Sequence, residues 1–360
     1  MAALNSELLH PQVLQAEQLD AQGLFDDAIN ALALATQAGN IEAKLRLGKR
    51  LFSGHNAPYL PREGINFIVE ASGHGSAEAA CVSSVLLASG VMGTRNWPLA
   101  LQALATAAAR DWIPAQQQLM LLLAPDATVS TPSAALPRSA QEWQQAGQSI
   151  NLAHWQQVPA ATTVHADPLL RSFPSFVPIA VCDRLIELSR HRLQRAEVYD
   201  PHHRRNIRTS TRTNSIAQYR LLEHELLHLL LQEKMARACG VDVNQMEATA
   251  ILHYSPGEEI TNHFDFVDPN TPNYAQEITD NGQRIITFLI YLNEDYAEGE
   301  TMFPRLGIKH KGQRGEGFYF VNCLPGQEPD LRTWHAGKPP VHSSKWIVSQ
   351  FIRNHAIVRL

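Results

Sequence analysis

The stretch "TNHFDFVD" (residues 261–268) sets His263 and Asp265 on either side of one phenylalanine. In a β-strand successive side chains alternate between the two faces, so His263 and Asp265 would project together and Phe264 would point the opposite way. One face of such a strand carries two groups that can bind a metal ion, and the other packs into a core. An H-x-D triplet also occurs as a surface ion pair, so the rest of the chain has to supply a third ligand.

The segments around this triplet predict helices followed by strands. Helical periodicity marks residues 177–193 and 219–240, and the second of these ends at Gly240, a plausible C-cap. Helices first and strands afterwards predict an α+β domain, or a β-sandwich flanked by helices. The predicted strands are "ATAILHY" (248–254), "RIITFLIYLN" (284–293), "GEGFYFVN" (315–322) and "KWIVSQFIR" (345–353).

His335, in "RTWHAGKPP", is the candidate for the third ligand. Two histidines and one carboxylate form the facial arrangement that holds non-heme Fe(II) and leaves coordination positions open. A 2-oxo acid can occupy two of these positions and dioxygen the third. Lys345 starts a strand whose alternating positions are apolar, and a lysine aimed inward there needs an anion because a buried, unpaired ammonium is costly. A dicarboxylate cosubstrate would supply that anion.

Four motifs resemble, in order, those of the prolyl 4-hydroxylase-like family of Fe(II)- and 2-oxoglutarate-dependent dioxygenases: "HYSPGEEITNHFDF", "RIITFLIYLNEDYAEGETMFP", "GEGFYFVN" and "HAGKPPVHSSKWIVSQFIR". The resemblance covers about residues 168–355. It implies a double-stranded β-helix, a jelly-roll barrel with its core at about residues 245–355 and iron at its open end. It also implies that His263, Asp265 and His335 hold Fe(II), with 2-oxoglutarate and O2 as cosubstrates, and it leaves ascorbate open as a further cofactor.

The same resemblance implies a cosubstrate pocket. In it Lys345 binds the distal carboxylate of 2-oxoglutarate, Tyr254 forms a hydrogen bond, and Thr287 is a further candidate. Each of these residues also has an ordinary structural explanation. A lysine at a strand end can lie at the surface, and a strand tyrosine usually packs in a core with its hydroxyl bonded to the backbone.

The substrate pocket departs from the family pattern. Prolyl hydroxylases of the family commonly place a tyrosine three residues before the first histidine and a tryptophan six residues beyond the lysine, whereas this chain has Ile260 and Phe351. These side chains predict a more apolar wall that orients a peptide amide less well. Arg212 lies where the family has an Arg-Thr-Ser stretch, and its segment 202–212 and the loop 266–283 are expected to contact the substrate.

The first third of the chain repeats with a period of 36 residues. The segments "ATQAGNIEA" (35–43), "ASGHGSAEA" (71–79) and "AAARDWIPA" (107–115) align at their alanines. Small residues at fixed positions in such a period predict stacked helical hairpins. The segment resembles the Sel1-like branch of the tetratricopeptide repeats, which implies a protein-binding array. A helical cap that only stabilises its neighbour is the alternative.

The length of 360 residues predicts more than one domain. The stretch "PDATVSTPSAALPRSA" is rich in Pro, Ser, Thr and Ala and predicts a linker, which a short helix around "QEWQQAGQSI" interrupts. The predicted organisation is therefore multidomain: an all-α helical-repeat domain (1–124), a linker (125–165) and an α+β dioxygenase domain (166–360).

Composition excludes some classes of partner. A formal charge of −5 gives no reason to expect nucleic acid or an anionic membrane surface. No apolar run is long enough to span a bilayer, and the N-terminal residues lack the pattern of a signal peptide. Four scattered cysteines without a C-x-x-C pair favour a reduced, cytoplasmic setting. The expected partners are a protein substrate bound through the repeats, or a small-molecule substrate.

Another motif offers a different enzyme class. "HELLH" (224–228) fits H-E-x-x-H, the helical zinc signature in which two histidines bind metal beside a general-base glutamate, and Glu247 is a candidate third ligand. The same five letters arise easily in a Leu-rich helix, and no metzincin-type extension follows. A zinc metallopeptidase is one alternative, and a repeat scaffold with a non-catalytic oxygenase domain is another.

Overall fold

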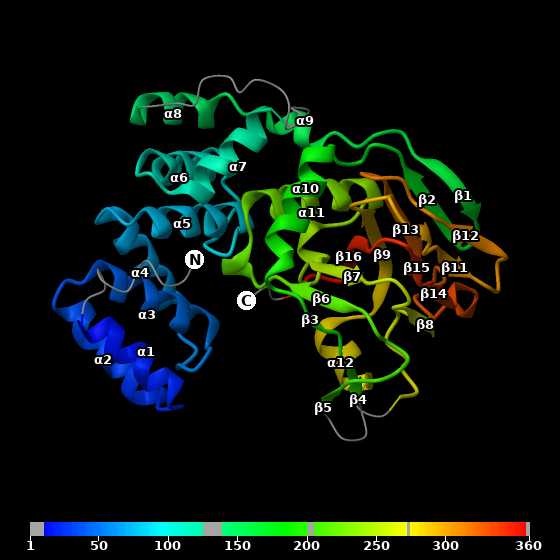
Figure 1. Ribbon diagram of the computed structural model, residues 1–360, viewed down its shortest axis with the longest axis horizontal. Coiled ribbons are helices and arrows are strands. Elements are labelled where there is room, and N and C mark those ends of the chain that lie inside the picture. The colour runs from blue at the N-terminus through cyan, green and yellow to red at the C-terminus, as the bar shows by residue number, and fades with distance from the viewer. Residues whose placement is uncertain (1–10, 125–138, 201–204, 272–273, 358–360) are drawn as a thin grey trace.

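The computed structural model describes residues 11–124, 139–200, 205–271 and 274–357. A stack of helices forms the N-terminal side of the molecule, and β-sheets form the C-terminal side (Figure 1). Among the described helices, none is long and apolar enough to cross a membrane. The arrangement agrees with the predicted helical-repeat and α+β parts.

The repeat array is built from helices that pack against their neighbours in sequence. They are α1 (Pro11–Ala21), α2 (Phe25–Gln37), α3 (Ile41–Ser53), α4 (Pro61–Gly73), α5 (Ala77–Ser89), α6 (Trp97–Ala109) and α7 (Ile113–Leu123). Ala35, Ala71 and Ala107 hold the same position in α2, α4 and α6, and all three are fully buried. Gly54 and Gly90 end α3 and α5 in the left-handed conformation that glycine favours. The 36-residue period is therefore the period of a helical hairpin.

The helices continue into the stretch that the composition predicted as a linker. α8 (Ala140–Gln148) packs against α6, where a Cβ added to Gly147 would lie 3.1 Å from Cβ of Ala105. α9 (Leu152–Gln156) follows it. The predicted linker is thus packed structure from α8 onward, because a glycine and a buried tryptophan outweigh the polar composition. Residues 125–138 of that linker lie outside the described residues.

Two facing sheets build the C-terminal part, the arrangement of a double-stranded β-helix. The larger contains β1 (Thr162–Ala166), β2 (Leu169–Phe173), β13 (Gly317–Val321), β9 (Arg284–Tyr291), β16 (Lys345–Arg353), β7 (Ala250–Tyr254), β6 (Ser215–Gln218) and β3 (Gln194–Arg195), in that order across the sheet. The smaller contains, in order, β12 (Ile308–His310), β11 (Thr301–Phe303), β14 (His335–Gly337) and β8 (Ile260–His263). Two short pairs, β10 (Ala297–Glu298) with β15 (Pro340–Val341) and β4 (Val198–Asp200) with β5 (Arg205–Ile207), complete the strands.

Both faces of the larger sheet are buried. Ile286, Phe288 and Ile290 of β9 join the core that also contains apolar residues of α10 (Ile179–Arg190) and α11 (Leu226–Cys239). Leu289 and Tyr291 of the same strand join a second core between the two sheets. Burial on both faces explains why β9 reads as a continuous apolar run rather than an alternating one.

The repeat array packs directly on α11, and buried apolar residues of α3 to α7 form one cluster with those of α10, α11 and one face of the larger sheet. Gln118 Oε1 of α7 accepts a hydrogen bond of 3.1 Å from the backbone N–H of Leu226, one of the first N–H groups of α11. Trp97 Nε1 of α6 donates to Glu233 Oε1 at 2.8 Å. Removing the array would therefore expose a core and leave buried polar groups of α11 without partners.

Two predictions near the first motif need correction. The strand predicted through residues 261–268 is β8, which ends at His263, so Asp265 lies in the loop beyond it. The predicted loop 266–283 contains the helix α12 (Tyr274–Asn281), and residues 272–273 lie outside the described part.

Candidate active site

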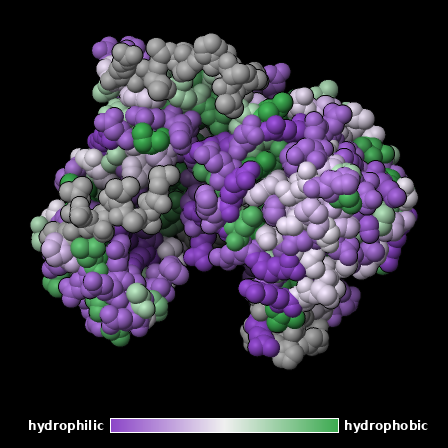
Figure 2. Space-filling model, in the orientation of Figure 1, coloured by the Kyte–Doolittle hydropathy of each residue, from purple (hydrophilic) through white to green (hydrophobic). Residues whose placement is uncertain are grey.

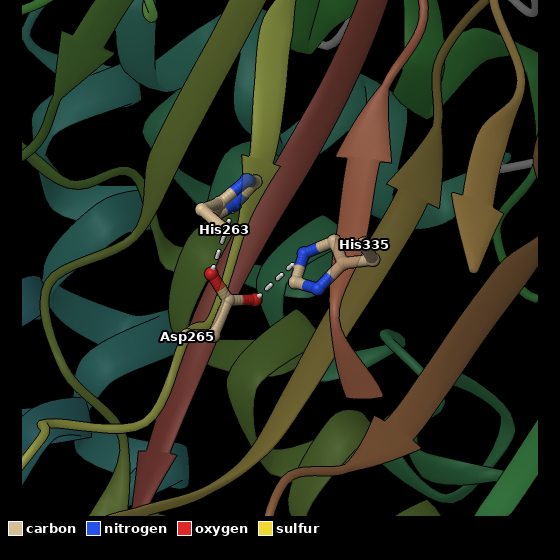
Figure 3. Close-up of side chains that lie close together, drawn as sticks. All are labelled: His263, Asp265 and His335. Atoms are coloured by element: carbon tan, nitrogen blue, oxygen red, sulfur yellow. Dashed lines mark ion pairs between the residues drawn. The ribbon is translucent and has the colours of Figure 1, made fainter. Parts of the chain in front are cut away.

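The three predicted metal ligands come together at one end of the barrel (Figure 3). His263 ends β8, His335 begins β14, and the two positions face each other in the register of the smaller sheet. Asp265 Oδ1 lies 3.3 Å from His263 Nε2, and Asp265 Oδ2 lies 3.4 Å from His335 Nε2. One ligand atom from each residue lies within 4.8 Å of the others. Within the described ranges no other set of three His, Cys, Asp or Glu residues is grouped in this way.

The backbone fixes the same tautomer in both histidines. His263 Nδ1 lies 2.8 Å from the carbonyl oxygen of Thr261, and His335 Nδ1 lies 2.9 Å from that of Thr333. A carbonyl only accepts, so each Nδ1 carries the proton and donates it. Each Nε2 then presents a lone pair towards the carboxylate of Asp265. Three converging electron-rich groups need a cation between them, and this donor set fits the two-histidine, one-carboxylate iron site.

A buried hydrogen-bond chain holds the carboxylate. Thr287 Oγ1 donates to Asp265 Oδ2 at 2.8 Å, and Asn322 Nδ2 donates to Thr287 Oγ1 at 3.0 Å. Burial alone would raise the pKa of the Asp265 carboxyl, but its interactions with the His335 and His263 side chains hold that pKa well below its usual value. The sequence pointed to Thr287 as a cosubstrate contact, and it gave no role to Asn322, which closes the motif "GEGFYFVN" just beyond β13.

Aromatic residues beside the ligands pack against one another. Phe264 stacks on Phe266 with ring centroids 4.5 Å apart and also meets Trp334, the neighbour of His335, at 4.5 Å. The guanidinium of Arg305 lies over the Phe264 and Trp334 rings. These contacts tie the two ligand-bearing segments together.

The predicted lysine is fully buried in the same barrel. Lys345 Nζ donates to the carbonyl oxygen of Gly299 at 2.7 Å and lies 5.2 Å from the ring centroid of Tyr254. Desolvation lowers the pKa of Lys345 to about 7, although the charge of Glu300 acts in the opposite direction. No carboxylate of the described residues forms an ion pair with this ammonium. The position therefore suits an anionic ligand.

A cavity of about 1020 Å³ connects these groups. Its lining includes the three ligand residues together with Lys345, Tyr254 and Thr287, and also the predicted substrate residues Arg212, Ile260 and Phe351. Arg212 bridges to Ile260 through the backbone, and its Nε donates to Asn214 Oδ1 at 3.3 Å. The guanidinium of Arg284, which also lines the cavity, lies 4.0 Å from the centroid of the Phe351 ring.

The HELLH motif does not form a metal site. His224 precedes α11, following the short helix η2 (Leu221–Glu223), and only His228 lies within α11. The backbone N–H of Glu225 donates to His228 Nδ1 at 3.0 Å, and the Glu225 carboxylate pairs with Arg184. Burial lowers the pKa of His228 well below its usual value. Glu247 is engaged by two arginines instead of by this motif. The zinc metallopeptidase alternative therefore has no site here.

Comparisons with known proteins relate the C-terminal part of the chain to iron-dependent oxygenases. The family model described as the 2OG-Fe(II) oxygenase superfamily matches residues 249–353. Prolyl 4-hydroxylase subunit alpha-1 of Gallus gallus is 28% identical over 166 residues, which are 46% of this chain and 32% of that protein. Prolyl 4-hydroxylase 13 of Arabidopsis thaliana is 24% identical over 209 residues, 52% of this chain and 72% of that protein. The chain thus spans about a third of the length of the first relative.

Two solved structures are similar to this chain over part of its length. The viral collagen prolyl hydroxylase of Paramecium Bursaria Chlorella virus-1 has a TM-score of 0.40 and 23% identity, over 52% of this chain and 96% of that chain. A Sel1 repeat protein from Oxalobacter formigenes has a TM-score of 0.26 and 19% identity, over 33% of this chain and 86% of that chain. Residues 249–353 thus match the model of the 2OG-Fe(II) oxygenase superfamily, and the C-terminal part of the chain is similar to the prolyl 4-hydroxylases.

Proposed function

We propose that the protein is an Fe(II)- and 2-oxoglutarate-dependent dioxygenase that hydroxylates its substrate. In this reaction O2 supplies one oxygen atom to the product and one to succinate, while 2-oxoglutarate loses CO2. The observation that carries the proposal is the convergence of His263 Nε2, His335 Nε2 and the Asp265 carboxylate in one cavity with the buried, unpaired Lys345. The metal, once bound, supplies open coordination positions for the 2-oxo acid and dioxygen.

Residues of the chain would orient the ligands and bind the cosubstrate. Two backbone carbonyls hold the imidazole tautomers, and Thr287 orients the carboxylate. Lys345 would bind the distal carboxylate of 2-oxoglutarate through a charge-assisted hydrogen bond. Tyr254 lies opposite Lys345 in the register of β7 and β16 and is buried in the same pocket. An ascorbate contact stays a prediction, and so does cytoplasmic location.

A protein residue is the substrate we favour. Relatives of the C-terminal part are named prolyl 4-hydroxylases. A second cavity of about 880 Å³ lies between the repeat array and the barrel, lined by residues of both, including Lys49, His55, Trp112 and Arg220. Hydrophilic residues follow the boundary between the two parts on the face seen in Figure 2. A polypeptide lying there would be held beside the barrel, whereas a small-molecule substrate would need only the first cavity.

The proposal is tested by incubating the full chain with Fe(II), 2-oxoglutarate and O2 and measuring succinate, without and with proline peptides, free amino acids or a cell lysate. We expect succinate formation that His335→Ala abolishes. Absence of succinate with every candidate would contradict the enzymatic reading and favour a non-catalytic scaffold.

The role of the repeats has its own test. Arg220→Glu, an exposed change in the second cavity, should reduce modification of a protein substrate while leaving succinate formed without substrate unchanged. Arg62→Glu, an exposed change on α4 away from that cavity, is the matched control. Equal modification by both variants would favour a small-molecule substrate and a purely structural array.

A further inference from the structure

The hydrogen bonds that run from Asn322 through Thr287 to Asp265 have a defined donor-to-acceptor direction. An ionised carboxylate only accepts hydrogen bonds, so the single hydroxyl proton of Thr287 is donated to Asp265 Oδ2 over 2.8 Å. The Thr287 oxygen is then left as an acceptor, and the Asn322 amide donates to it over 3.0 Å. Thr287 and Asn322 are 1% and 0% exposed, so water does not compete for these bonds.

This direction distinguishes the two oxygens of Asp265. Oδ2 accepts the Thr287 proton and lies 3.4 Å from His335 Nε2, whereas Oδ1 lies 3.3 Å from His263 Nε2. A carboxylate that rotates freely can offer one or two oxygens to a metal ion. Here the threonine bond holds the plane of the carboxylate, so that each of its oxygens faces one histidine Nε2.

We infer that Asn322, acting through Thr287, is a positioning residue that orients the Asp265 carboxylate towards the metal position beside His263 and His335. The inference rests on the proposed function, because it assumes that Asp265 is a metal ligand. Asn322 is itself held by the backbone: its N–H donates to the carbonyl of Ile285, and its carbonyl accepts from the N–H of Asp330. Through these hydrogen bonds the larger sheet orients the carboxylate of Asp265, although Asp265 itself lies in a loop.

The test uses Co(II) alone, without cosubstrate or turnover. Removing a partner that orients a ligand typically weakens metal affinity 10- to 100-fold. We therefore expect Thr287→Val to raise the Co(II) dissociation constant by about 10- to 100-fold and Thr287→Ser, which keeps the hydroxyl, to stay within about threefold of the parent. Asn322→Leu should raise the constant by a smaller factor. The combination with Thr287→Val should bind no more weakly than Thr287→Val alone, because Asn322 acts only through the hydroxyl.

Thr301→Val is the matched control. Thr301 is another buried threonine that lines the cavity, but its hydroxyl pairs with Tyr291 and not with a ligand, so Co(II) affinity should not change. Melting temperatures without metal identify variants that lose fold, and Thr287→Ser and Asn322→Leu remain informative if Thr287→Val is unstable. An unchanged constant in Thr287→Val, or additive losses in the double variant, would overturn the positioning role. If the parent binds Co(II) no better than His263→Ala does, the proposed metal site itself fails.

Discussion

Two pairs of histidines in this chain have similar distances between their rings, but their ring nitrogens form different hydrogen bonds. The rings of His263 and His335 have centroids 4.3 Å apart, and those of His224 and His228 lie 5.2 Å apart. In the first pair both Nδ1 atoms donate to carbonyls, so both Nε2 lone pairs point at a carboxylate. In the second, His228 Nδ1 accepts from the backbone, which places the proton on Nε2. The direction of the lone pairs, rather than the presence of histidines, distinguishes a metal site from a packed pair.

The largest effect expected from this comparison is the loss of metal on changing the first pair. Asp265→Ala removes the anionic ligand and should reduce bound Fe(II), measured by elemental analysis after anaerobic loading, from about one per chain to none. His228→Ala should leave the iron content unchanged, because its ring donates no lone pair to a shared position. Stoichiometric zinc that disappears in His228→Ala would instead revive the peptidase alternative.

The next effect is on stability and concerns Glu247, the ligand that the HELLH alternative required. Its carboxylate bonds Arg284 Nε at 2.7 Å and Arg353 Nε at 2.5 Å. Glu247→Gln should destabilise the fold by about 3–5 kcal/mol, measured by urea unfolding, because Arg284 loses its carboxylate partner and Arg353 keeps only Glu277. Iron content should not change. A loss of metal with unchanged stability would show that Glu247 serves a site and not the fold.

A smaller effect is expected in the cosubstrate pocket. Lys345→Ala removes a charge-assisted hydrogen bond to a carboxylate, worth about 1.5–3 kcal/mol, so the 2-oxoglutarate dissociation constant should rise by about 10- to 150-fold. Iron content should stay at the parent level, which separates this residue from the ligands. Lys345→Arg should also be impaired, because the planar guanidinium needs more room than an ammonium. Unchanged binding in Lys345→Ala would contradict the proposed cosubstrate role.

The smallest effect is a pH dependence that only the parent should show. In the empty pocket the pKa of Lys345 is about 7, below its ordinary value of 10.5. An anion binds the protonated form, so the 2-oxoglutarate dissociation constant should rise about tenfold per pH unit above pH 7. The unfolded chain holds this proton up to higher pH than the folded chain, so unliganded stability should also rise from pH 7 towards pH 10.5. Lys345→Met should show neither trend.

Sequence patterns predicted the elements that repeat along the chain or alternate along a strand. The aligned alanines marked the helical hairpins, the strand patterns marked β7, β9, β13 and β16, and the ordered motifs located the ligands and Lys345. The repeated T-x-H in "TNH" and "TWH" carried a signal for the tautomers that becomes clear only with the backbone in place. Contacts between distant segments left no such signal. Asn322 meets Thr287 across two strands, and Gln118 meets α11 across two domains.

The most direct test of the iron site is an anaerobic titration of Fe(II) in the presence of 2-oxoglutarate, followed by visible absorption. Chelation of a 2-oxo acid at Fe(II) gives a weak charge-transfer band that neither component shows alone. We expect this band at one equivalent of iron in the parent and in His228→Ala, and its absence in His263→Ala and Asp265→Ala. A band that persists in the last two variants, or no band in the parent, would contradict the assignment of His263, Asp265 and His335 as the iron ligands.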